Sequence, residues 1–194
     1  MSDDNTGYTS PVEDNLLGLT SSKEINDAEA EGVVKAEYFI TDLESDTQVT
    51  SALIKEIHKE TFGHLYEWAG KWRTSTPRVG AYIPPEPKDL PNLMYQFEDE
   101  LKHRMKNIKS EEDLVDTLAY AHHRFVFIHP FTNGNGRTAR LLTDLIAILN
   151  GYEFIKLYYR EGKERERYIE AIRAADQYDF TKLKELIKKE LRKL

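Results

Sequence analysis

The chain contains no cysteine among its 194 residues. Disulfide bonds, thiolate nucleophiles and cysteine-ligated metals are therefore excluded as sources of stability or chemistry. It also lacks an excess of positive charge, because 27 lysines and arginines face 34 acidic residues, for a formal net charge of −7. A chain this acidic does not favour nucleic acid as its main partner.

Long apolar runs are absent as well. No stretch approaches the roughly 20 apolar residues of a membrane-spanning helix, and the acidic N-terminal residues do not resemble a signal peptide. We therefore expect a cytoplasmic protein without a membrane partner. The chain also lacks a Gly-x-x-x-x-Gly-Lys-(Ser/Thr) sequence, which excludes a P-loop nucleotide-binding protein.

The pattern of apolar residues predicts an almost entirely helical chain. Polar residues 1–20 predict a flexible arm, and residues 21–194 predict a single domain. Apolar positions at helical spacing predict helices over residues 22–44, 47–69, 89–107, 110–128, 137–149, 161–175 and 181–193. Residues 74–91 contain five of the seven prolines and cannot be a helix, so we expect a short hairpin near residues 79–83.

The most informative stretch is residues 129–140, which read His-Pro-Phe-Thr-Asn-Gly-Asn-Gly-Arg-Thr-Ala-Arg and lead into an apolar helical segment. Gly134 and Gly136 allow a sharp turn and a close approach of the backbone to a ligand. Backbone N–H groups at the start of the helix attract anions. Arg137 and Arg140 are three residues apart and share one helix face, where they would otherwise oppose the helix dipole. The stretch therefore predicts a phosphate-binding loop.

His129 stands directly before this loop. An imidazole can accept a proton near neutral pH. A hydroxyl group held between this base and a bound phosphate would be activated for in-line attack, while the loop N–H groups and the arginines stabilise the phosphoryl oxygens. The residues alone therefore predict a phosphoryl- or nucleotidyl-transfer site.

The same stretch resembles the signature of Fic proteins, His-Pro-Phe-x-(Asp/Glu)-Gly-Asn-Gly-Arg-x-x-Arg. Every specified position matches except Asn133, where the family usually has a carboxylate. The chain is similar in this respect to the branch labelled mobile mystery protein B, which also carries asparagine there. The resemblance extends over roughly residues 15–180, and it implies an all-α bundle, the Fic fold, with a small β-hairpin flap.

The resemblance implies a protein adenylyltransferase, which transfers AMP from ATP to a hydroxyl side chain of a target protein or of itself. His129 resembles the general base and Phe131 the buried anchor of the loop. The remaining signature residues resemble ligands of the ATP phosphates, namely Asn133, Gly134, Asn135, Gly136, Arg137 and Arg140. The family's acidic residue holds Mg²⁺, so Asn133 would offer Mg²⁺ a carbonyl oxygen without a negative charge.

Two further features follow from the resemblance. Residues Val79, Gly80, Ala81 and Tyr82 resemble the flap that aligns a target segment with His129 by strand addition. Glu31, followed by Gly32, resembles the glutamate of an inhibitory helix, and we expect it to contact Arg140 and block the γ-phosphate position. The alternative for Glu31 is an ordinary solvated acid on a helix, and the alternative for residues 79–82 is an ordinary loop.

Other functions remain open at this stage. Phosphoryl transfer is known in the Doc relatives, but those carry Ala-Asn-Lys in place of residues 134–136. Removal of AMP, with Glu31 positioning water, is a further alternative, and a non-catalytic nucleotide-binding module that regulates a partner is another. An antitoxin or other regulatory partner would leave no signal in this sequence. His122 and His123 suggest a metal site with His129, but histidines without matched acids on an apolar helix are more often packed.

Overall fold

The computed structural model describes residues 15–77, 79, 82–159 and 161–194. In this part of the chain seven α-helices and one 3-10 helix account for the regular structure. They are α1 (Ser22–Thr41), α2 (Ser51–Phe62), η1 (Pro87–Asp89), α3 (Leu90–Lys106), α4 (Glu111–Ile128), α5 (Asn135–Leu149), α6 (Gly162–Ala175) and α7 (Thr181–Glu190). The helical prediction is confirmed, and none of these helices is long and apolar enough to cross a membrane.

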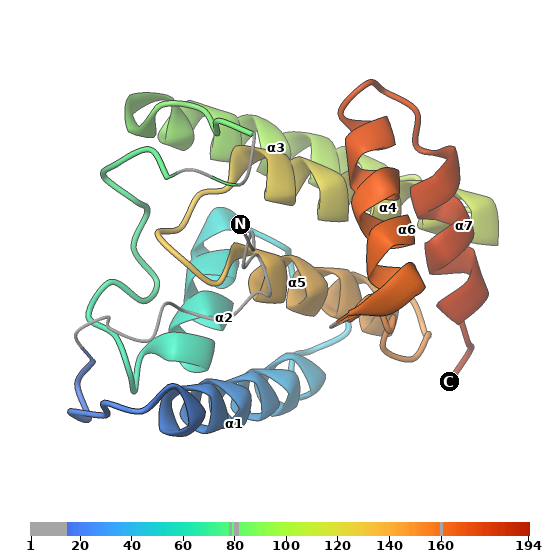
Figure 1. Ribbon diagram of the computed structural model, residues 1–194. Helices are drawn as coiled ribbons and strands as arrows, with labels where there is room; N and C mark the ends of the chain where they lie inside the picture. Colours follow the sequence, from blue (N-terminus) through green and yellow to red (C-terminus); the bar gives the residue numbers. More distant parts are fainter. Residues whose placement is uncertain (1–14, 78, 80–81, 160) are drawn as a thin grey trace.

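Helix α5 lies in the middle of the bundle (Figure 1). It packs against α4, α1 and α2, while α4 also contacts α3 and α7. Its residues Leu141, Leu142, Leu145 and Ile146 are almost completely buried in the main hydrophobic core. Because the N-terminus of α5 follows the signature loop directly, this burial fixes the position of the loop.

Side-chain caps explain where several helices begin. Ser21 accepts a hydrogen bond from the N–H of Glu24, Thr50 from that of Leu53 and Ser110 from that of Asp113. Each of these bonds satisfies an N–H group that the helix itself leaves without a partner. Polar side chains in the sequence therefore mark helix starts to within a residue.

The predicted helix over residues 47–69 is too long. Helix α2 ends at Phe62, and the Phe62 carbonyl then accepts hydrogen bonds from both Leu65 and Tyr66 in a sequence of turns. The aromatic and aliphatic residues after α2 still pack inward, because Leu65, Tyr66 and Ala69 form a second buried cluster with Phe62. The predicted helix was extended too far because the residues after Phe62 are apolar and buried, although they do not follow a helical spacing.

The predicted hairpin flap is not seen as a pair of strands. In the described residues it is reduced to one antiparallel bridge, in which Val79 and Tyr82 exchange backbone hydrogen bonds of 3.2 and 2.9 Å. Gly80 and Ala81 lie outside the described residues. Pro84 and Pro85 follow, and because proline has no N–H group they cannot extend a ladder.

Helix α1 approaches α2 very closely at Gly32. A Cβ atom on Gly32 would lie 1.9 Å from the backbone oxygen of Thr61 and 2.7 Å from Cε1 of His64. Since the Thr61 oxygen belongs to the backbone, it cannot move aside as a flexible side chain could. Only glycine fits at this contact.

We therefore expect Gly32→Ala to lower the free energy of unfolding, although alanine is the better helix former. Overpacking of this kind costs about 1–3 kcal/mol. Urea unfolding followed by circular dichroism would measure the change, with the exposed Ala30→Ser on the same helix as a control. An unchanged stability for Gly32→Ala would show that α1 does not pack on α2 as described.

Candidate active site

The signature loop begins at His129, which ends α4 in a left-handed conformation with φ 51° and ψ 58°. Its N–H donates to the carbonyl of Phe125, so the residue still belongs to the helix cap. Burial lowers the pKa of His129 to about 4. A backbone hydrogen bond with Val126 opposes this shift, and the positive charge of Arg73 adds to it. The imidazole is therefore neutral at physiological pH, which is the form that can accept a proton.

Arg73 holds the first part of the loop. Its Nε donates to the His129 carbonyl at 2.7 Å, and its backbone N–H donates to the Pro130 carbonyl at 2.9 Å. Its guanidinium also donates to the carbonyl of Pro85, on the far side of the flap segment. Arg73 is almost completely buried. The sequence carried no sign of these contacts, because apart from the nearby Ser75 carbonyl the oxygens that Arg73 reaches are 12 or more residues away.

The Asn135 side chain closes the loop from within. Its Oδ1 accepts the N–H of Phe131 at 2.9 Å, and its Nδ2 donates to the carbonyl of the same residue at 2.8 Å. Phe131 is fully buried, as the prediction of an anchor requires. The Asn135 side chain therefore shapes the loop, and only its backbone N–H, in the first turn of α5, is left to face an anion.

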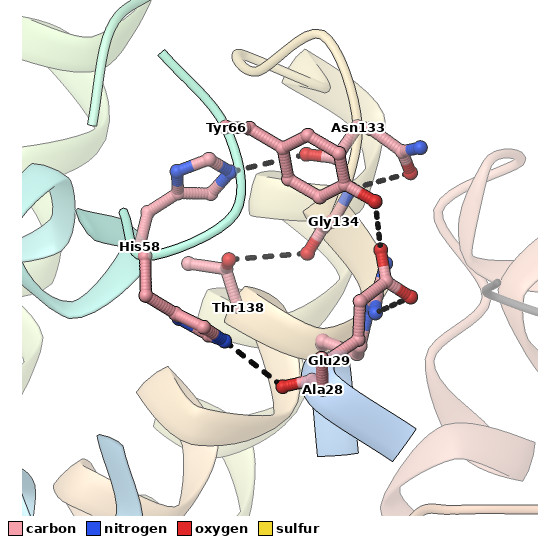
Figure 2. Close-up of polar contacts among 9 residues, drawn as sticks. Ala28, Glu29, His58, Tyr66, Asn133, Gly134 and Thr138 are labelled. Carbon is pink, nitrogen blue, oxygen red and sulfur yellow. Dashed lines mark hydrogen bonds and ion pairs between the residues drawn. The ribbon is translucent and has the colours of Figure 1, made fainter. Parts of the chain in front are cut away.

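Gly134 is the N-cap of α5 and has a φ of 74°, a conformation that favours glycine. A Cβ atom there would lie 2.4 Å from the Phe62 ring. The Gly134 carbonyl accepts hydrogen bonds from the N–H and the hydroxyl of Thr138, as Figure 2 shows for the hydroxyl. Gly136, in contrast, faces open space near Arg140. The first glycine thus serves the turn, and the second leaves space beside Arg140.

Asn133 occupies the position of the family's metal-binding acid. Its Oδ1 accepts the N–H of the next residue, Gly134, at 2.7 Å, so one of the lone pairs of this oxygen is already used. Among the described residues no group of three or more histidines and acids could hold a metal ion. Asn133 thus places a neutral amide, whose oxygen already accepts one hydrogen bond, where the family usually has a charged carboxylate.

Arg137 is paired with Glu29. Its Nη1 lies 2.7 Å from Glu29 Oε2, with both side chains at least nine-tenths buried. The Tyr66 hydroxyl donates to the other carboxylate oxygen at 3.1 Å (Figure 2). Nε and Nη2 of Arg137 are buried and have no hydrogen-bond partner among the described residues. A guanidinium with unused N–H donors next to a helix N-terminus is suited to bind a phosphate group if Glu29 moves away.

The predicted contact between Glu31 and Arg140 is wrong. The Glu31 side chain is 68% exposed and pairs with Lys35 at 3.3 Å, so it does not reach Arg140. Two residues along a helix turn the side chain by about 200°, which places Glu29 and Glu31 on opposite faces. Glu29 shares the buried face of α1 with Ile25, Gly32 and Ala36. Arg140 instead lies over the ring of Tyr158, 4.9 Å from its centre.

A cavity of about 490 Å³ lies beside these arginines, between α1, α5 and the segment after α5. Apolar side chains from Val33, Leu141, Phe154 and Leu157 contribute to its walls, and Glu29, Arg137, Arg140 and Asp144 contribute charged groups. Asp144 Oδ1 accepts the N–H of Ile155 at 2.7 Å. Burial raises the pKa of the Asp144 carboxyl to about 7. The hydrogen bond from Ile155 opposes this shift, and the negative charge of Glu37 adds to it.

Asp144 therefore destabilises the protein when it is ionised. Below pH about 4 the carboxyl is protonated in both the folded and the unfolded state, so it does not affect the free energy of unfolding. Between pH about 4 and 7 the unfolded chain has lost the proton and the folded protein has kept it, so stability falls as the pH rises. We expect Asp144→Asn, which keeps the acceptor for Ile155, to raise the free energy of unfolding at pH 8 by up to about 4 kcal/mol. The gain should shrink toward pH 4 in urea unfolding curves, and the exposed Asp99→Asn should show no such trend. Equal effects at both pH values would contradict the assignment.

His122 and His123 are hydrogen-bonded within the bundle. His122 contacts the Thr143 hydroxyl at 3.0 Å and the Tyr168 hydroxyl at 2.8 Å, and His123 contacts Asp176 at 2.9 Å. Both residues join α4 to its neighbours and do not converge on His129. On the flap side, the Tyr82 hydroxyl donates to the Phe127 carbonyl at 2.7 Å, which ties the predicted flap to the end of α4.

His58 is the other site residue that the sequence did not reveal. It is fully buried on α2, where its Nδ1 accepts the N–H of Gly70 at 2.9 Å and its Nε2 lies 3.1 Å from the Asn133 carbonyl. Figure 2 shows the ring pointing at the loop. The sequence carried no signal for this contact beyond a histidine in an apolar stripe, because Asn133 is 75 residues away.

Curated relatives share this sequence region. The protein adenylyltransferase Fic of Nematostella vectensis is 32% identical over 128 residues, which cover 66% of this chain and 29% of the relative. The protein of the same name from Aedes aegypti is 34% identical over 133 residues, covering 68% of this chain and 26% of the relative. The chain thus spans less than a third of the length of these relatives.

Solved structures share the fold. The BepC protein of Bartonella tribocorum with bound AMPPNP superimposes with a TM-score of 0.78 at 19% identity, over 93% of this chain and 92% of that one. Fic-1 of C. elegans superimposes with a TM-score of 0.70 at 26% identity, over 96% of this chain and 52% of that one. A sequence model of the Fic/DOC family matches residues 48–147, which is just over half of the chain and includes the whole signature loop. The loop geometry, the helical bundle and these matches agree, and the chain belongs to the Fic/DOC family.

Proposed function

We propose that this chain is a nucleotidyltransferase that moves AMP from ATP to a serine, threonine or tyrosine hydroxyl of a protein. The observation that carries the proposal is the neutral imidazole of His129 beside a loop whose carbonyls are tied back into the protein. The carbonyls of His129, Pro130, Phe131, Asn133 and Gly134 all accept internal hydrogen bonds. The polar face left for a ligand therefore consists of N–H groups at the start of α5. The relatives named protein adenylyltransferase Fic support the choice of AMP as the transferred group.

In the proposed reaction the target hydroxyl attacks the α-phosphorus of ATP. His129 takes the hydroxyl proton as the new O–P bond forms, and the bond from the α-phosphorus to the bridging oxygen breaks, releasing pyrophosphate. The N–H groups of Asn135 and Gly136 stabilise the charge on the α-phosphoryl oxygens. Arg137 and Arg140 stabilise the pyrophosphate that leaves. Negative phosphate beside His129 raises the pKa of its imidazole above the value in the free protein, toward the range useful for a base.

Mg²⁺ belongs to the proposed substrate complex. Asn133 Oδ1 would be the protein's ligand to a Mg²⁺ ion bound by ATP, and the ion would neutralise phosphate charge. The flap residues Val79, Gly80, Ala81 and Tyr82 would bind the target segment by backbone pairing, so that its hydroxyl reaches His129. The Val79–Tyr82 bridge supports a chain reversal at this point.

The proposal includes self-inhibition, with Glu29 as the inhibitory residue. Its carboxylate is paired with Arg137, so it would compete with a phosphate of ATP for that guanidinium. Tyr66 holds the carboxylate in place, and the Tyr66 ring is itself stacked on Trp68 with the ring centres 4.5 Å apart. The resting protein would therefore bind ATP weakly or in an unproductive position until α1 releases Arg137.

Incubation with ATP labelled on the α-phosphate, and in parallel on the γ-phosphate, tests the proposed function. The assay uses purified protein alone and with host lysate, in the parent chain and in Glu29→Gln. Label on protein from the α-phosphate supports AMP transfer, whereas label from the γ-phosphate would show phosphoryl transfer of the Doc type. Binding of ATP without either label would indicate a regulatory nucleotide-binding module. Loss of label from previously modified protein would indicate removal of AMP.

A further inference from the structure

We propose that His58 is a positioning residue that sets the orientation of the phosphate-binding loop and links it to the segment leading to the flap. The inference rests on the proposed function in assigning phosphate binding to the loop. The geometry itself depends only on contacts within the described residues. No element of the signature contains His58, which stands on α2, more than 70 residues before the loop.

The hydrogen bonds of His58 determine its tautomer. The N–H of Gly70 can only donate, so Nδ1 must carry a lone pair. The Asn133 carbonyl can only accept, so Nε2 must carry the proton. Burial lowers the pKa of His58 to about 3, so the ring remains neutral and keeps this arrangement over the physiological range. One imidazole thus joins two backbone segments and has no hydrogen-bonding capacity left over.

The His58 ring also contacts the apolar side of the loop. It stacks on Phe131 with the ring centres 3.6 Å apart and the planes 18° from parallel. It also lies 4.9 Å from the ring of Phe62, which fills the space next to Gly134. His58 therefore contacts the loop directly at Phe131 and Asn133, and its neighbour Phe62 fills the space beside Gly134.

The bond to Asn133 controls which way the next peptide group points. In a trans peptide the carbonyl and the following N–H point in opposite directions. Holding the Asn133 carbonyl toward α2 turns the Gly134 N–H away from α2, where it meets Asn133 Oδ1. The same bond therefore orients the oxygen that we assign to Mg²⁺ and the start of α5. Without it, the Asn133–Gly134 peptide could rotate and disturb the N–H groups that follow.

The bond to Gly70 reaches the other half of the site. Three residues after Gly70, Arg73 holds the carbonyls of His129 and Pro130, and its guanidinium reaches Pro85 beyond the flap. Between them, the Trp72 ring lies 4.8 Å from that of Phe131. His58 and Arg73 therefore fix successive parts of the loop from one segment, so that the position of the flap and the shape of the phosphate site depend on each other.

Two conservative variants separate the two bonds. Glutamine places an amide donor near the position of Nε2, so His58→Gln keeps the bond to Asn133 and loses the one to Gly70. Asparagine places an amide oxygen near the position of Nδ1, so His58→Asn keeps the bond to Gly70 and loses the one to Asn133. Both lose the aromatic stack, and we expect similar falls in thermal stability. A purely structural role would affect both variants alike.

The measurements use the Glu29→Gln background, in which Arg137 is released. We expect His58→Asn to weaken binding of AMPPNP about ten-fold in titration calorimetry, the effect of one hydrogen bond to a buried carbonyl. His58→Gln should bind AMPPNP within about two-fold of the parent, a free-energy difference below 0.5 kcal/mol. If the chain transfers AMP, His58→Gln should still lower the rate of transfer to protein, because it disturbs the flap side. Equal AMPPNP affinities in the two variants would overturn the proposal.

A second readout keeps this test separate from that of the proposed function. Hydrogen exchange of the amides of Gly134 and Thr138, which donate to Asn133 Oδ1 and to the Gly134 carbonyl, can be followed by NMR without any nucleotide. We expect faster exchange in His58→Asn than in His58→Gln at these two amides, with equal rates in α7 as an internal control. That difference would support the positioning role even if ATP were not a substrate, and its absence would refute the role even if ATP were one.

Discussion

Replacing His129 by alanine is expected to reduce AMP transfer about 10²–10⁴-fold, the usual contribution of a general base. In the proposed complex the nucleotide is held by backbone N–H groups and arginines, so its affinity should stay within about two-fold, a free-energy difference below 0.5 kcal/mol. The rate should depend on His129 because its imidazole is neutral and stands at the entrance to the loop, where it can take a proton. Incorporation of α-labelled ATP in the Glu29→Gln background would measure the rate, and calorimetry would measure the affinity.

The exposed His103→Ala provides the matched control and should leave both quantities unchanged. The pH dependence gives a further check. A base must be deprotonated to act, so the rate in the parent protein should fall as the pH drops below the pKa of His129 in the ATP complex. That decline should be missing from the residual activity of His129→Ala. Full activity of His129→Ala would remove the imidazole from the mechanism and leave loop electrostatics as the only catalytic contribution.

Replacing Glu29 by glutamine is expected to increase AMP incorporation at least about ten-fold, which corresponds to roughly 1.4 kcal/mol of inhibition removed. The substitution leaves an oxygen for the Tyr66 hydroxyl but removes the charge that neutralises Arg137. A buried guanidinium without its carboxylate is costly, and loss of one partner of such a pair typically costs about 3–5 kcal/mol. We therefore expect a lower melting temperature that ATP partly restores, because ATP phosphates replace the lost anion.

Glu31→Gln is the control for this experiment, since it makes the same chemical change two residues away on the exposed face of α1. It should change neither AMP incorporation nor stability measurably, because an exposed pair of this kind contributes little. Activation by Glu31→Gln, with no effect of Glu29→Gln, would refute the assignment of Glu29 as the inhibitory residue. It would support Glu31, the residue that the spacing of the family motif predicts.

The sequence predicted those parts of the site that are contiguous in the chain. Residues 129–140 form a loop and the start of α5, as predicted, because their conformation depends mainly on residues next to one another in the chain. The ligand roles of Gly134, Asn135 and the two arginines stay predictions. The site residues it missed, His58 and Arg73, act through backbone carbonyls dozens of residues away. A backbone carbonyl has no residue identity, and a contact to it therefore leaves no pattern in the sequence.

Glu29 shows a different kind of error. The motif spacing selected Glu31, although the apolar positions of α1, Ile25, Gly32 and Ala36, place residue 29 on their own face. An acid on an apolar helix face is a signal for a buried partner, and helical geometry would have identified it. The hairpin was overestimated for a related reason, because the resemblance supplied two strands where the prolines after Tyr82 allow a single bridge.

The tight contact at Gly32 links the packing of α1 to the proposed inhibition. Glu29 and Gly32 are one helical turn apart on the buried face of α1, and at Gly32 the backbone of α1 lies directly against that of α2 at Thr61. Any change that moves this part of α1 away from α2 would therefore also move Glu29 relative to Arg137. We expect such a change to activate the protein and to weaken the α1–α2 contact at the same time.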